Sequence, residues 1–148
     1  MTEKRGKTLQ LLLVLAVIFG SHHLMPIKML IEPPLNCLGL PLILVGVLLD
    51  VWAASLFREK ETSFKLRGGN AFLITDGPFG FSRNPIYLGI LAALLGLAIF
   101  LGSLTAFLYP ALFFILFQFV FIPMEERRME ETFGEKYLEY KRKVRRWL

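Results

Sequence analysis

The sequence predicts an all-α integral membrane protein: a bundle of four transmembrane helices with an amphipathic helix after the last one. Of its 148 residues 55% are hydrophobic, and they gather into four apolar runs. Each run approaches the roughly 20 residues that cross a bilayer as a helix. No linker or repeat divides the chain, so we expect one domain over residues 1–148. The predicted spans are residues 8–27, 38–57, 85–101 and 104–122, with a tail over 123–148.

Basic residues predict the orientation. If the N-terminus is cytoplasmic, 16 of the 17 Lys and Arg residues lie in cytoplasmic segments and only Lys28 lies outside. We therefore expect both termini to face the cytoplasm, in the cell (inner) membrane. This topology accounts for the net charge of +5, so membrane lipid is an expected partner and nucleic acid is not. We expect the first run to be retained, because residues 20–23 lack a signal-peptide cleavage pattern.

The first two spans carry few groups with chemistry of their own. His22 and His23 point in different directions on a helix, without carboxylates or thiols at ligand spacing, so no metal site is expected. Asp50 is the only acidic residue inside the second run, which makes it a functional candidate by default. It lies about two turns before Arg58, where water or a basic partner could reach it. A structural role and a catalytic role for Asp50 both stay open.

A polar loop over residues 58–82 is expected to lead into the third span. There Asn84 is a favourable N-cap and Pro85 suits the first helical position, so the helix should begin at Pro85. The positive end of the helix dipole then lies beside Arg83, and the two should attract an anionic group. Alternatively, Arg83 only anchors the helix among lipid headgroups.

The third and fourth spans are separated by little more than Gly102 and Ser103, which predicts an antiparallel helical hairpin. The hairpin would bring the start of the third helix beside Glu125 and Glu126, at the end of the fourth. An anion-binding pole next to a cation-binding pole suits a zwitterionic amino-acid group. Alternatively, the two carboxylates pair with surface cations.

The tail is amphipathic, with apolar residues at three- and four-residue spacing among charged ones. These apolar positions are Met129, Phe133, Tyr137, Tyr140 and Val144. Gly134 should divide the tail into two pieces. A basic amphipathic helix of this kind is expected on the membrane surface, where it could roof the two poles.

Two stretches together resemble the isoprenylcysteine carboxyl methyltransferase family of membrane enzymes, which are similar to phospholipid methyltransferases. The order and spacing of the two motifs carry the resemblance, which covers the chain from about Leu73 onward. The stretches are GPFGFSRNPIYLG at residues 77–89, and Glu125-Glu126 followed by the FG, Tyr, Tyr and VRR positions of residues 133–146.

The resemblance implies methyl transfer from S-adenosylmethionine to a lipophilic acceptor, such as the carboxylate of a prenylcysteine-like substrate. Asn84 stands where many family members have His, and an amide can donate a hydrogen bond but cannot be charged. The implied cofactor-binding residues are Arg83, Asn84, Pro85, Tyr87, Glu125 and Glu126.

A carboxylate acceptor would need no general base, whereas an amine or thiol would need one. Arg142 or Arg145 could orient a carboxylate through paired hydrogen bonds, and Tyr140 lies close to Arg142 in sequence. We therefore expect catalytic roles for Arg142, Arg145 and Tyr140.

Three other functions stay open. Phospholipid N-methylation would use the same cofactor, whereas a sterol-reductase-like enzyme would use a nicotinamide. The third is a small non-catalytic membrane subunit whose basic tail binds lipid or a partner. Binding of S-adenosylmethionine would separate the methyltransferases from the last two.

Overall fold

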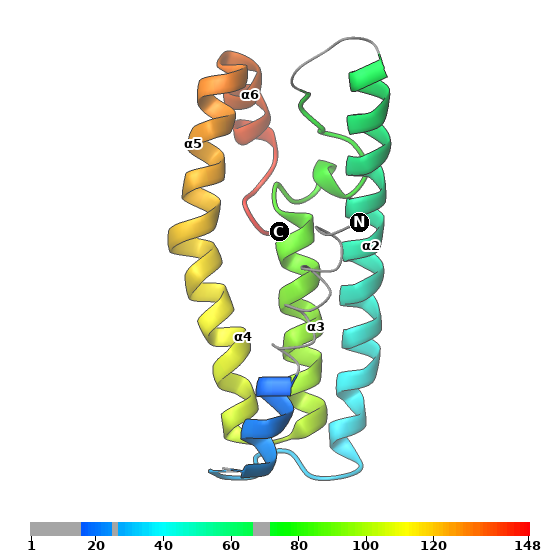
Figure 1. The fold of residues 1–148 in the computed structure, drawn as a ribbon, viewed down its shortest axis with the longest axis vertical. Coiled ribbons are helices and arrows are strands. Elements are labelled where there is room, and N and C mark those ends of the chain that lie inside the picture. Colours follow the sequence, from blue (N-terminus) through cyan, green and yellow to red (C-terminus); the bar gives the residue numbers. More distant parts are fainter. Residues whose placement is uncertain (1–15, 25–26, 67–71) are drawn as a thin grey trace.

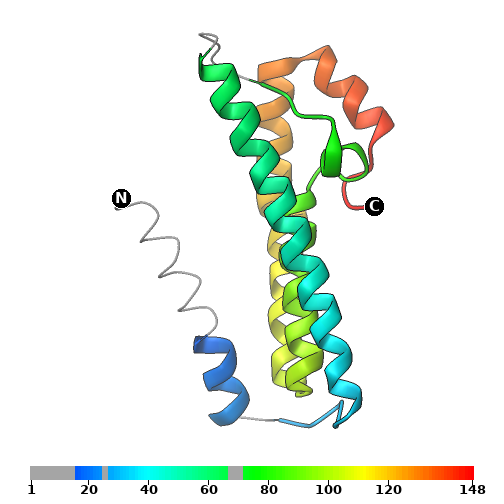
Figure 2. The same cartoon turned by 90° about the vertical axis from the view of Figure 1, so that its right-hand side faces the viewer.

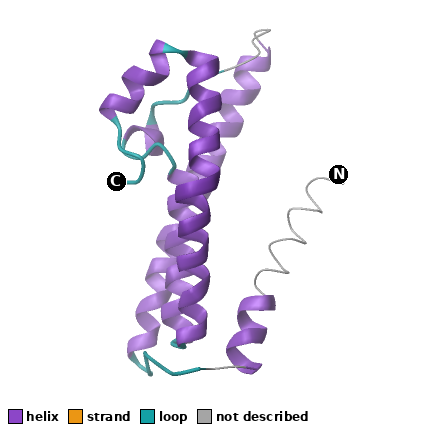
Figure 3. Ribbon diagram, turned by 90° about the vertical axis from the view of Figure 1, so that its left-hand side faces the viewer, coloured by secondary structure: helices purple, strands orange, loops and turns teal. Residues whose placement is uncertain are grey.

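A computed structural model describes residues 16–24, 27–66 and 72–148, and all regular elements in these residues are helices (Figure 3). The all-helical prediction is therefore confirmed. Residues 16–24 are helical, whereas residues 8–15 and 25–26 of the first predicted span lie outside the described residues. The further elements are η1 (Leu35–Leu38), α2 (Gly39–Leu66), η2 (Gly77–Gly80), α3 (Pro85–Leu101), α4 (Leu104–Leu116), η3 (Phe117–Phe121), α5 (Ile122–Phe133) and α6 (Glu135–Lys143).

The described helices include two that are long and apolar enough to cross a membrane, Leu35–Lys60 and Leu104–Phe133. A third apolar helix, Pro85–Leu101, is shorter. The helix of the second span does not end near Arg58 as predicted but continues through α2 to Leu66. Arg, Lys and Glu are good helix formers, so the helix can outlast its apolar part. Part of the predicted polar loop is therefore helix.

Glycines set the contact between α2 and α3, which lie side by side along most of their length (Figure 1). A Cβ atom on Gly89 would lie 2.7 Å from the carbonyl oxygen of Gly46, and one on Gly46 would lie 2.5 Å from the backbone nitrogen of Ala93. Gly39 and Gly96 make a second close approach near the other end of the pair. The missing side chains let the two backbones meet, as in other membrane helix pairs.

The hairpin between α3 and α4 is confirmed. Gly102 ends α3 with a φ of 72°, a left-handed conformation that glycine adopts without strain. Ser103 caps α4, because its side chain accepts a hydrogen bond from the backbone N–H of Ala106. The backbone of residues 28–30 crosses the turn: Leu104 N donates to Lys28 O at 2.8 Å, and Leu30 N donates to Gly102 O at 2.7 Å.

From Leu104 to Phe133 the helical chain is continuous, and it passes beyond the predicted end of the fourth span (Figure 1). Residues Phe117–Phe121 form a π-helical turn, which is wider than an α-helical one. Pro123 follows two residues later and cannot donate to the carbonyl of Phe119, so a regular α-helix is already interrupted at this point. The helix then carries Glu125 and Glu126 on α5.

The tail forms two pieces around Gly134, as predicted, and Gly134 has a φ of 54°. After this residue α6 turns back toward the start of α3 (Figure 2). Its apolar face is not turned to a membrane surface as expected, because Tyr137, Tyr140 and Val144 are buried and pack with Leu73 and residues of α5. The tail therefore covers one end of the bundle, the end opposite the α3–α4 turn (Figure 1).

Candidate active site

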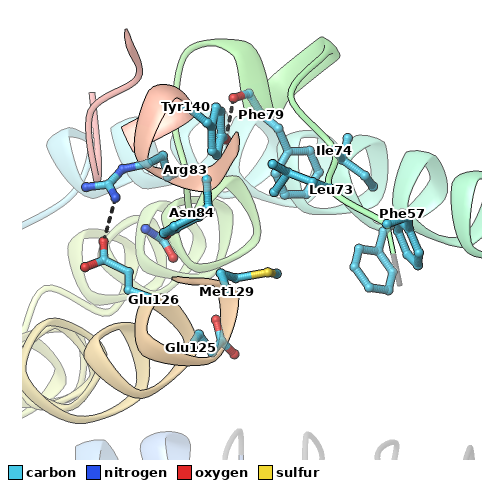
Figure 4. Close-up of a pocket in the computed structure, with 12 residues that line it drawn as sticks. Phe57, Leu73, Ile74, Phe79, Arg83, Asn84, Glu125, Glu126, Met129 and Tyr140 are labelled. Carbon is cyan, nitrogen blue, oxygen red and sulfur yellow. Dashed lines mark hydrogen bonds and ion pairs between the residues drawn. The ribbon is translucent and has the colours of Figure 1, made fainter. Parts of the chain in front are cut away.

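Two adjoining cavities lie where α3 begins, beside α5, at the end of the bundle that carries the tail, and Figure 4 shows residues that line the smaller one. The larger has a volume of about 420 Å³ and the smaller of about 70 Å³. Tyr137 and Tyr140 of α6 line the smaller cavity, so the tail does roof part of the site. Both cavities are lined by Phe57, Phe79, Arg83, Asn84, Glu125 and Met129.

The start of α3 lies at Pro85, as predicted, with Asn84 at the N-cap position. The Asn84 side chain makes no capping hydrogen bond, however. Its amide Nδ2 donates to the backbone carbonyl of Arg146 at 2.9 Å, while Ser82 Oγ accepts from the Asn84 N–H at 3.2 Å. The amide is used to hold the end of the chain, which local sequence preferences do not predict.

Arg83, just before α3, and Glu126, on α5, form a buried ion pair, with Arg83 Nη1 3.0 Å from Glu126 Oε1. Only 8% of each side chain is exposed. The pair does not use all of the guanidinium, because the buried Arg83 Nε has no hydrogen-bond partner among the described residues. The two predicted poles thus do lie side by side, and the arginine keeps a donor for a further acceptor.

Arg146, which the sequence did not single out, completes this charged cluster. Its Nη2 donates to Glu126 Oε2 at 2.8 Å and its Nε donates to Glu126 Oε1 at 3.2 Å. Lys141 Nζ lies 3.8 Å from the same carboxylate. The available signal was the Arg-Arg-Trp ending of the tail, but it also fits a helix that contacts lipid headgroups.

Glu125 points in a different direction from Glu126 (Figure 4). Glu125 also lines the larger cavity, whereas Glu126 lines only the smaller of the two. Tyr87 donates its hydroxyl hydrogen to Glu125 Oε1 at 2.7 Å. The Tyr87 ring stacks on Phe117, with 4.4 Å between the ring centroids. The two neighbouring glutamates therefore serve two environments, a charged cluster and the wall of a mostly apolar cavity.

Tyr137 and Tyr140 stay protonated around neutral pH. Burial raises the pKa of Tyr140 to about 12, with a further contribution from Tyr137. Burial also raises the pKa of Tyr137, and the negative charge of Glu126 adds to that shift. Tyr140 donates its hydroxyl hydrogen to Phe79 O at 2.7 Å, so this phenol acts as a donor (Figure 4).

Two other predicted catalytic residues lie apart from this cluster. Arg142 is on the exposed face of α6, where its Nη2 pairs with Glu135 Oε1 at 2.7 Å and 64% of its side chain is exposed. Arg145 contributes its backbone carbonyl, which accepts a hydrogen bond from Arg83 N at 3.0 Å. Of the three predicted catalytic residues, only Tyr140 lines a described cavity.

The described residues contain no group of three or more His, Cys, Asp and Glu side chains arranged to hold a metal ion. His22 Nδ1 instead lies 2.8 Å from Ser103 Oγ, at the far end of the bundle. Asp50 lies against Gly89 at the glycine contact between α2 and α3 and lines neither of the two cavities.

The helices of membrane-spanning length define a helical membrane protein. Its polar site lies at one end of the bundle, where a cluster of opposite charges adjoins a mostly apolar cavity. Residues 35–136 match the family model described as phospholipid methyltransferase. The chain belongs to this phospholipid methyltransferase family.

Two relatives show how far the similarity extends. The protein-S-isoprenylcysteine O-methyltransferase of Schizosaccharomyces pombe is 27% identical, over 74% of this chain and 55% of that protein. The chain thus spans about half the length of this curated relative. An uncharacterized protein of Haemophilus influenzae is 40% identical over 63 residues, which are 43% of this chain and all of that protein. No solved structure matches the chain.

Proposed function

We propose that the chain is a membrane methyltransferase that transfers a methyl group from S-adenosylmethionine to a lipophilic acceptor. One observation carries this proposal: in a member of this family, the buried Arg83 lines a 420 Å³ cavity with largely apolar walls and pairs with Glu126, which lines the smaller cavity beside it. A polar cofactor group and an apolar acceptor need such neighbouring environments. The same cavity favours an acceptor with an apolar chain.

The residues at the start of α3 fit the amino-acid part of the cofactor. Arg83 has a buried donor, Nε, without a hydrogen-bond partner among the described residues, and a guanidinium with a free donor suits a carboxylate. Glu126 offers a buried carboxylate for an ammonium group. Asn84, Pro85, Tyr87 and Glu125 line the adjoining cavity and would bound the rest of the cofactor. This assignment supports the cofactor-binding residues expected from the sequence.

S-adenosylmethionine supplies an electrophilic methyl group on a sulfonium when it is bound. The protein then has to align the reactants and exclude water, because no protein nucleophile is required. Apolar side chains such as Phe57, Phe79 and Met129 keep the cavity wall dry. The Arg83–Glu126 pair fixes the two charged groups on two helices, so their separation is set by the fold.

The first candidate acceptor is the carboxylate of a prenylcysteine-like substrate, as the name of the fission yeast relative suggests. A carboxylate needs no proton removed before it attacks, and the raised pKa values of Tyr137 and Tyr140 make these phenols poor bases. The second candidate is a phospholipid amine, which the family description favours. The acceptor-handling roles of Arg142, Arg145 and Tyr140 stay predictions.

The experiment is a calorimetric titration of the purified protein with S-adenosylmethionine, followed by methyl transfer to two acceptors. We expect binding by the parent and at least about tenfold weaker binding by Glu126→Gln, a loss of about 1.4 kcal/mol. Glu135→Gln is the matched control, because Glu135 pairs with Arg142 on the surface. If the parent does not bind S-adenosylmethionine, a reductase-like enzyme or a non-catalytic subunit replaces this proposal.

Binding alone does not name the acceptor, so the second step compares a prenylcysteine that has a free carboxylate with phosphatidylethanolamine. The methyl ester of the same prenylcysteine is the control, since its carboxylate is already blocked. Methylation of the free acid alone supports the carboxylate acceptor. Methylation of phosphatidylethanolamine alone would instead assign the chain to phospholipid N-methylation.

A further inference from the structure

Arg146 offers one acceptor and one cation to the two poles of the proposed cofactor site. Its backbone carbonyl accepts hydrogen bonds from Asn84 Nδ2 at 2.9 Å and from Ser82 Oγ at 3.4 Å. Its guanidinium binds both oxygens of Glu126, at 2.8 and 3.2 Å. A single residue of the chain end therefore contacts both the start of α3 and the buried carboxylate of α5.

An amino acid presents the same pair of functions, an acceptor carboxylate and a donor ammonium. The match at Glu126 is close, because a guanidinium and an ammonium are both cationic donors. The match at the other pole is incomplete, because a neutral carbonyl stands where a carboxylate would be. The buried Arg83 Nε accordingly stays without a hydrogen-bond partner among the described residues, while Nη1 faces Glu126 Oε1 at 3.0 Å. A ligand with a full negative charge would satisfy the guanidinium better.

The segment that carries Arg146 lies outside the helices and follows the last buried residue of the tail cluster, Val144. Residues 145–148 have no regular secondary structure. Beyond Arg146, the segment is tied by the Arg145 carbonyl, which accepts from Arg83 N, and by Trp147, whose Nε1 donates to Gln118 Oε1 at 2.8 Å. The Trp147 ring also lies against Phe114, with 5.6 Å between the centroids. Release of these contacts would leave the buried face of α6 in place.

We propose that the C-terminal segment, residues 145–148, is an internal competitor that occupies the amino-acid part of the cofactor site and must leave when the cofactor binds. The proposal rests on the proposed function, because it concerns the same poles. It assigns the segment a regulatory role: any event that draws Arg146 or Trp147 away would open the site. The apparent affinity of a ligand falls by the fraction of molecules in which the site is closed.

The test measures cofactor affinity and the position of the segment separately. Trp147 reports the segment by its fluorescence in a Trp52→Phe background, since the chain has two tryptophans. Saturating S-adenosylmethionine or S-adenosylhomocysteine should shift the Trp147 emission to the red and increase quenching by a water-soluble quencher. Calorimetry of Arg146→Ala should give at least about threefold tighter binding of S-adenosylmethionine than the parent.

A second variant covers the possibility that Arg146 has other roles. Trp147→Ala leaves both poles untouched and removes the contacts of the indole with Gln118 and Phe114, so it should also tighten binding. Lys143→Ala is the matched control, because it removes an exposed cation from the same tail. We expect the control to bind like the parent.

The outcomes separate this proposal from the proposed function. Suppose that the parent binds S-adenosylmethionine but the Trp147 fluorescence does not change, or that both variants bind the cofactor no more tightly than the parent. The segment is then a fixed part of the site and the competitor proposal is refuted, while the proposed function stands. If neither the parent nor Arg146→Ala binds, both proposals fail.

Discussion

The guanidinium of Arg83 and the carboxylate of Glu126 meet 3.0 Å apart, and each side chain is 8% exposed. Arg83 precedes the first residue of α3 and Glu126 lies in the second turn of α5, so the pair ties the two ends of the hairpin together. A buried pair of this kind is costly to break, because removing one partner leaves the other charge buried and uncompensated.

Glu126→Gln should therefore lower the free energy of unfolding by about 3–5 kcal/mol, the range for loss of one partner of a buried pair. We expect a value near the lower end, since Arg146 is partly exposed and can turn to water. Reversible unfolding in mixed micelles measures the change. Glu135→Gln should change it by less than about 1 kcal/mol, because an exposed pair contributes little. Equal effects of the two substitutions would contradict a buried Arg83–Glu126 pair.

The glycine contact between α2 and α3 leads to a prediction about packing. Gly89→Ala should destabilise the protein by about 1–3 kcal/mol, because the added methyl group would meet the Gly46 carbonyl at 2.7 Å. Gly20→Ala is the control, since nothing lies within 4 Å of its added Cβ and alanine favours a helix. Thermal unfolding of both variants in the same detergent checks the difference. A stable Gly89→Ala protein would mean that the helices are further apart.

Tyr140 predicts how stability depends on pH. Its pKa is about 12 in the folded protein, against about 10 for an exposed tyrosine, so folding favours its protonated form. Its contribution is fully present below pH 10 and is lost as the pH rises through the folded pKa. The Tyr140→Phe protein should lose less stability across this alkaline range. Absorbance of tyrosinate, followed together with unfolding, measures the effect. If the Tyr140→Phe protein shows the same pH dependence of stability as the parent, other groups cause that dependence.

The proposed topology has four spans and both termini in the cytoplasm. It predicts that a reporter fused after Leu148 stays cytoplasmic, whereas a reporter in the segment around Lys28 is exported. In the structure Lys28 lies at the α3–α4 turn, opposite the end that carries α6. Export of the reporter after Leu148 would reverse the orientation and move the candidate site to the outer face.

Local signals predicted the parts of the fold that local chemistry decides. Pro85 at the start of α3, the turn at Gly102 and Ser103, and the break at Gly134 all follow from backbone preferences of single residues. The position of Glu126 beside Arg83 followed from the hairpin, because two antiparallel helices joined by a short turn must bring their far ends together.

The remainder depends on tertiary contacts that a sequence pattern does not contain. Asn84 had a good local partner as an N-cap, yet its amide binds the carbonyl of Arg146, from the end of the chain. Arg142 was a predicted catalytic residue and Arg146 was not singled out, although both are basic residues of the tail, and only the path of the chain after α6 separates the surface pair from the buried cluster. The apolar face of α6 was equally suited to lipid and to the loop at Leu73, which covers it.

The π-helical turn at residues 117–121 sets the rotational phase of everything that follows it. A π-helical turn contains one residue more than the α-helical turn it replaces, and each residue of an α-helix turns the chain by about 100°. If the same residues formed a regular α-helix here, α5 would be rotated about its axis and Glu126 would no longer face Arg83. A deletion of one residue within 117–121 should therefore preserve the pair and cofactor binding, whereas the same deletion at Met124 should abolish both. The extra residue of the π-helical turn thus keeps Glu126 of α5 facing Arg83 at the start of α3.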